Sequence, residues 1–159
     1  MRFLGSSLIF LCITLAGLLH KLKLDQSLKQ WQQMQQLLQL VAEELQDSLR
    51  GCEEILVSLR DSFSDFLFLQ DYFRQDGSVQ QRLRAAAQTL TDPKLREIAL
   101  RFAARFGTAS LEIQLESIHR LEQLCTAELQ RRWEQTEKNG TLSLQLGLLC
   151  GAAAAILLL

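Results

Sequence analysis

Hydrophobic residues gather at the two ends of this chain, and polar residues occupy its middle. Residues 3–20 and 141–159 contain no Asp, Glu, Lys or Arg. A helix rises about 1.5 Å per residue, so a stretch of roughly 18 residues spans about 27 Å, close to the thickness of the hydrocarbon layer of a bilayer. The pattern therefore predicts a transmembrane helix at 3–20 and another at 141–159, on either side of a polar segment at 21–140.

In the polar segment, apolar residues recur every three or four positions, which is typical of helices with one buried face. From Leu24 onwards the opposite face is rich in glutamine, and no glycine or proline interrupts the pattern before Gly51. We therefore expect the first membrane helix to continue as one long rod. The same spacing continues through Ile55 and Phe63 as far as Gly77.

The rest of the segment carries clear helix starts and stops. A shorter helix is predicted at 79–90. Asp92 followed by Pro93 is a typical start, because the carboxylate can accept from the first amides and the fixed φ of proline suits the first turn. Gly107 fits the left-handed position that ends many helices, and a final helix follows from about Ser110. No stretch alternates with period two for long, so the fold class is all-α, an antiparallel helical bundle with the clustered phenylalanines as its core.

Charge and cysteine usage narrow the possible functions. The net charge of -1 gives no reason to expect nucleic acid as a partner, since phosphate binding requires a concentrated basic surface. The four cysteines show no CxxC spacing, so neither a disulfide framework nor a zinc site is predicted. Basic residues flank both predicted spans on the side of the middle segment, which predicts a cytoplasmic location for 21–140; they are Lys21, Lys23, Lys29, Arg131, Arg132 and Lys138.

Two other interpretations of the apolar ends stay open. The first end could be a signal peptide cleaved near Thr14 and Ala16, although Lys21 directly after it opposes export. The second end could be a removable anchor signal with Asn139 and Gly140 as its small residues, although the polar spacer of such a signal is missing.

One residue pair resembles part of a catalytic site. Glu116 and His119 have the Glu-x-x-His spacing of di-iron bundles, but those sites need two copies. The other histidine, His20, has no glutamate three residues before it. The sequence also lacks a Gly-rich phosphate loop and any Ser-His-Asp set. We therefore expect no enzyme, no cofactor and no catalytic or metal-binding residue.

The charges of the middle segment are unevenly distributed. Residues 43–76 contain nine acidic and three basic residues, whereas residues 82–105 contain six basic and two acidic ones. Lys94, Arg101 and Arg105 share one face of a predicted helix, opposite its apolar residues. These charges could be merely solvated, or the two regions could pack against each other; alternatively, the basic face is a candidate site for binding an acidic partner.

A family pattern is carried most closely by two segments near the end of the chain, "RFGTASLEIQLESIHRLEQL" and "EKNGTLSLQLGLLCGAAAAILLL", and it extends to Leu4-Gly5 and "LLQLVAEEL". Through these segments the chain resembles the stage III sporulation protein AB family of endospore-forming bacteria. The sequence departs from the family where "DSLRG" replaces a turn with Tyr-Gly and Pro, and where Thr108 replaces an acidic helix cap. We expect these departures to change individual surface contacts and not the architecture.

The resemblance implies a function that composition and spacing do not. It implies a non-enzymatic platform component of the secretion-like channel complex between mother cell and forespore, similar to the helical domains of type II secretion and type IV pilus platform proteins. The implied partners are a cytoplasmic secretion-type ATPase, stage III sporulation protein AA, and other membrane proteins of the channel. The implied location is the mother-cell-derived membrane around the forespore. The alternative is a membrane-tethered helical adaptor or coiled-coil scaffold unrelated to sporulation.

Overall fold

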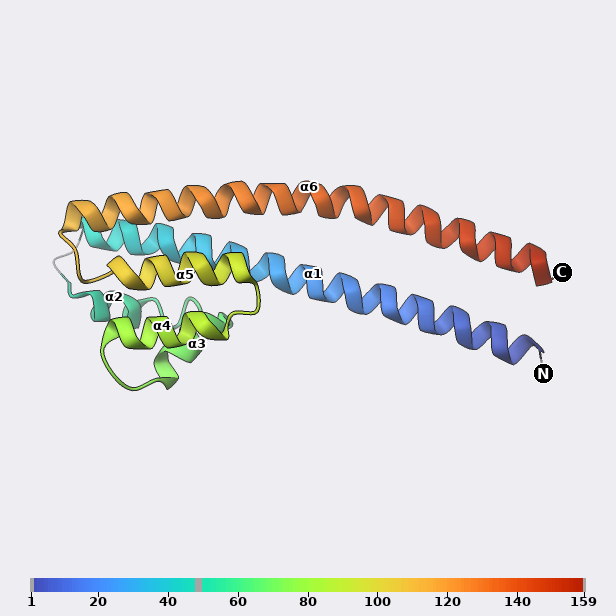
Figure 1. Cartoon of the computed structure of the whole chain (residues 1–159), viewed down its shortest axis with the longest axis horizontal. Helices are drawn as coiled ribbons and strands as arrows, with labels where there is room; N and C mark the ends of the chain where they lie inside the picture. Colours follow the sequence, from blue (N-terminus) through green and yellow to red (C-terminus); the bar gives the residue numbers. More distant parts are fainter. Residues whose placement is uncertain (1, 48–49, 159) are drawn as a thin grey trace. The chain divides into compact units, whose positions relative to one another are not determined.

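The computed structural model describes the backbone of residues 2–47 and 50–158 and the side chains of residues 25–47 and 50–135. The backbone described in these ranges forms six α-helices and no strand (Figure 1). The all-α prediction is therefore confirmed for this part of the chain. The helices are α1 (Arg2–Asp47), α2 (Cys52–Ser58), α3 (Leu67–Arg74), α4 (Val79–Thr89), α5 (Pro93–Arg105) and α6 (Leu111–Leu158).

The chain divides into two compact units, and the long helices α1 and α6 contribute to both of them. One unit is residues 29–129, which contains all of α2 to α5. The other consists of residues 1–28 together with residues 130–159. Helix α1 runs without a break from Arg2 to Asp47, so the predicted continuation of the first helix into the middle segment is confirmed.

The predicted membrane spans fall in the second of these units. Among the residues whose side chains are described, no helix is both long and apolar enough to cross a membrane. The stretches at 3–20 and 141–159 lie outside those side chains, although α1 and α6 cover their backbone as far as Leu158. Both spans therefore stay predictions.

The core of the 29–129 unit receives apolar side chains from all six helices. Phe102 is 1% exposed, and its ring stacks on that of Phe106 with the centroids 4.7 Å apart. Phe66 lies near Phe63 and Phe68, at centroid distances of 6.3 and 5.7 Å. The phenylalanines thus form a core, as the sequence predicts, because close contacts between large rings bury much apolar area.

Local side-chain chemistry sets the ends of the short helices. Ser78 accepts a hydrogen bond from the Gln81 amide at 3.4 Å, and the Gln81 side chain accepts one from the Ser78 amide at 3.1 Å, which forms a capping box at the start of α4. Asp92 caps α5, and Pro93 is its first residue. Gly107 follows the α5 C-cap with a φ of +78°, so the predicted left-handed position is confirmed.

The helical spacing between Ile55 and Gly77 proves misleading. Helix α2 ends at Ser58, turns follow through Asp65, and α3 begins at Leu67. The Ser58 hydroxyl donates to the Ile55 carbonyl at 2.8 Å. Several residues of the following turns are also short and polar. Such side chains hydrogen-bond to nearby backbone and compete with helix formation. The apolar spacing is kept because buried phenylalanines anchor the turns as well as the helices.

We expect a fragment of residues 22–138 to fold alone, because the 29–129 unit has a continuous core of its own. It should be soluble, strongly helical by circular dichroism and cooperative in thermal unfolding. A helical fragment that melts without cooperativity would instead indicate a tethered coil and would favour the scaffold alternative.

Replacing Phe102 by alanine should lower the free energy of unfolding of this fragment by about 3 to 5 kcal/mol, because the ring is fully buried and leaves a cavity. Denaturant unfolding measures the change. Leu124→Ala is the control, since Leu124 is 49% exposed and its loss should matter by no more than about 0.5 kcal/mol. Equal losses for the two variants would contradict this assignment of the core.

Candidate docking site

The candidate site is the basic face of α5, formed by Lys94, Arg101 and Arg105. All three residues are exposed. On the other side of the same helix, Leu95 and Phe102 are buried in the core. The 3.6-residue period of the helix thus separates the charges from the apolar residues, as the sequence predicts. Whether a partner binds this face stays a prediction.

The three cations have different surroundings. The Lys94 ammonium lies 3.0 Å from each carboxylate oxygen of Glu128 on α6. Arg101 pairs with Glu97, one turn before it, at 2.5 Å, and both side chains are 60% exposed. Among the described residues, the Arg105 guanidinium has no ion pair. Arg105 therefore has no ion pair among the described residues, Arg101 has an exposed ion pair within its own helix, and Lys94 has an ion pair with another helix.

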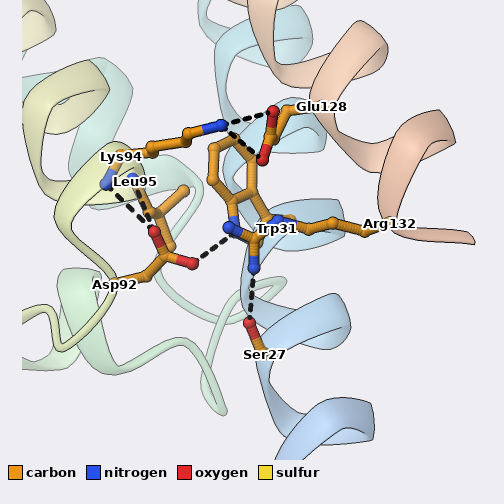
Figure 2. A network of polar contacts seen from close by, with 7 residues as sticks. All are labelled: Ser27, Trp31, Asp92, Lys94, Leu95, Glu128 and Arg132. Atoms are coloured by element: carbon orange, nitrogen blue, oxygen red, sulfur yellow. Dashed lines mark hydrogen bonds and ion pairs between the residues drawn. The ribbon is translucent and has the colours of Figure 1, made fainter. Parts of the chain in front are cut away.

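A polar network at the start of α5 explains the position of Lys94 (Figure 2). One oxygen of Asp92 accepts from the amides of Lys94 and Leu95, at 3.0 and 3.3 Å. The other oxygen accepts from the indole N–H of Trp31 on α1, at 3.1 Å. Trp31 is 1% exposed, so this bond satisfies a buried donor. The Asp92 carboxylate fixes the first turn of α5 against α1, and the Lys94 side chain extends that connection to Glu128 on α6.

The same figure contains one bond within the other unit. Arg132 of α6 donates to the hydroxyl of Ser27 on α1 at 3.1 Å. Arg132 is one of the basic residues on which the predicted orientation depends, and it is partly buried.

The acidic and basic regions of the sequence pack against each other where α3 contacts α4. Arg82 of the basic region pairs with Glu53 of the acidic region, and its guanidinium lies 4.6 Å from the centroid of the Tyr72 ring. Burial raises the pKa of the Tyr72 hydroxyl, and the nearby Arg82 charge partly opposes this. Packing of the two regions against each other is therefore observed at Arg82, whereas Arg101 and Arg105 stay on the surface.

The loop between α5 and α6 is held by Gln114, a role that the sequence analysis does not predict. The side-chain oxygen of Gln114 accepts from the Gly107 amide at 3.0 Å, and its nitrogen donates to the Ala109 carbonyl at 2.6 Å. Gln80 of α4 donates to the Phe106 carbonyl at 3.2 Å. Gln114 is buried, and the signal for its role is a glutamine on the apolar face of the final helix.

The Glu-x-x-His pair is not arranged as a metal site. Glu116 pairs with Arg120, and the His119 ring lies 3.5 Å from Glu122. Among the described side chains, no group of three or more His, Cys, Asp or Glu residues could hold a metal ion.

Comparison with known proteins gives one match. No curated protein and no solved structure matches the chain. The family model of stage III sporulation protein AB matches residues 2–159. Because this match covers nearly the entire sequence, the chain belongs to the stage III sporulation protein AB family, which indicates a role in sporulation.

Proposed function

We propose that this chain is a non-enzymatic, membrane-anchored platform in the channel complex between mother cell and forespore, and that its 29–129 unit docks a cytoplasmic secretion-type ATPase. Membership of the sporulation family supports the setting. The observation that carries the docking proposal is the exposed basic face of α5, which lies on a folded unit between two apolar ends. The partner is stage III sporulation protein AA, the ATPase that the resemblance implies.

The apolar ends supply the anchor in this proposal. Residues 3–20 and 141–159 cross the membrane once each, and the basic flanking residues keep the 29–129 unit in the cytoplasm. Helices α1 and α6 continue from that unit towards the two ends of the chain. A partner bound to the unit is thereby tethered to the membrane through two helices.

Electrostatic attraction is the expected basis of docking. Arg101 and Arg105 lie one turn apart, and Arg101 can exchange its exposed Glu97 partner for a carboxylate of the ATPase at little energetic cost, since exposed ion pairs contribute only about 0 to 1 kcal/mol. Arginine side chains also bind carboxylates through two parallel hydrogen bonds. Such a face increases the rate of association with an acidic surface more than it increases the final affinity.

Arg101→Glu combined with Arg105→Glu should weaken ATPase binding by roughly tenfold at low ionic strength, because the variant repels the acidic surface that the wild type attracts. Its melting temperature should be nearly unchanged, since both side chains are exposed. The difference in binding should shrink as salt is added. Titration of the purified full chain with the ATPase, followed by interferometry, measures the effect.

The matched control is Arg74→Glu combined with Arg120→Glu. These arginines are 72% and 73% exposed and have local acidic partners, but they lie on α3 and α6. The control makes the same change in net charge away from α5, so it should retain most of the binding. Equal binding by the α5 variant and the wild type at low salt would show that the basic face of α5 does not bind the ATPase.

The proposed topology needs an introduced cysteine as its probe. Burial raises the pKa of the Cys125 thiol to about 12, so this residue carries almost no thiolate at neutral pH and cannot report on location. Ser62 is exposed in the turns after α2. In a chain whose four native cysteines are alanine, Ser62→Cys should resist an impermeant maleimide in intact cells and react after lysis. Tags at either terminus should be accessible without lysis. Labelling of residue 62 in intact cells would overturn the orientation.

A further inference from the structure

The three residues of the basic face are not equally available to a partner. The Lys94–Glu128 pair joins residues that are 34 positions apart, and both carboxylate oxygens lie 3.0 Å from the ammonium. The Glu128 side chain is only 17% exposed, whereas that of Lys94 is 52% exposed. A carboxylate that is largely removed from water gains more from a nearby cation than an exposed one does, so Glu128 holds its lysine more firmly than Glu97 holds Arg101.

The backbone of Lys94 cannot move freely to serve a second partner. Its amide donates to Asp92, and the same carboxylate accepts from the buried Trp31 indole. The first turn of α5 is thereby fixed, and only the flexible lysine side chain can swing between Glu128 and the solvent. The structure shows the Lys94 side chain bound to Glu128 of α6, and only release from that carboxylate would make it available to a partner.

We infer that Glu128 acts as an autoinhibitory contact, which withholds Lys94 from the basic face until an acidic partner competes for it. This inference rests on the proposed docking of the ATPase at that face. In the resting unit, two carboxylates neutralise two of its three cations, and Arg105 makes the first contact. An ATPase that also engages Lys94 must displace Glu128, so the intramolecular pair lowers the affinity by the free energy of that contact.

The competition couples docking to the packing of α6 on α5. The two effects are linked. The Lys94–Glu128 pair lowers the affinity for the partner by some factor, and a bound partner weakens that ion pair by the same factor. Any displacement of Glu128 away from α5 conversely frees Lys94 and increases the affinity. Glu128 lies near the end of the 29–129 unit, where α6 continues into the other unit.

Removal of the Glu128 charge tests this inference by a gain of binding. Glu128→Gln in the full chain should bind the ATPase roughly two- to fivefold more tightly at low salt, which is the range for one ion pair of limited exposure. Glu128→Asp keeps the charge but shortens the side chain, so its gain should be smaller and in the same direction. Adding Lys94→Gln to Glu128→Gln should abolish the gain, because the gain depends on the freed lysine.

The control for net charge is Glu116→Gln, which removes a carboxylate from the same helix where it pairs with the exposed Arg120. It should change binding less than Glu128→Gln does. If Glu128→Gln and Glu116→Gln bind equally, or if the gain survives Lys94→Gln, Lys94 is not withheld and the inference fails while docking stands. If the Arg101 and Arg105 double variant also binds like the wild type, the docking proposal itself fails.

Discussion

The arrangement of the 29–129 unit depends on the shared carboxylate of Asp92. One oxygen caps the first amides of α5, and the other accepts from the indole of Trp31. The cap decides at which residue α5 begins, and the bond to the indole decides which side of α5 faces α1. Every later residue of the helix is then placed by the helical period, with Phe102 in the core and the basic residues outside. The start of α5 thus determines which of its residues pack in the core and which lie on the surface.

Interactions between neighbours along the chain could be predicted from the sequence. The Asp92-Pro93 start, the left-handed Gly107 and the buried Phe102 follow from local rules, and the structure confirms each of them. The break after Ser58 could not be predicted, because the apolar spacing continues through it and tertiary packing keeps the phenylalanines buried in turns. Spacing alone shows which residues are buried better than it shows where a helix stops.

The candidate site was predictable only in part, for a related reason. The helical period placed Lys94, Arg101 and Arg105 on one face, and the local partner of Arg101 is visible in the sequence at four residues' distance. The partner of Lys94 comes from a different helix, so no local rule could identify it. The role of Gln114 was hidden too, because its hydrogen bonds depend on the path of the loop. Long-range polar contacts are what the structure adds.

The loop between α5 and α6 also determines the rotation of α6 about its own axis. Only residues 106–110 separate the two helices, and Gln114 uses one amide group to satisfy both Gly107 and Ala109. One additional residue after this clamp would advance the rest of α6 by about 100°. Glu128 would then point to another side of its helix, far from the ammonium of Lys94. The number of residues between the Gln114 clamp and Glu128, 14 positions further on, therefore decides which charge stands opposite Lys94.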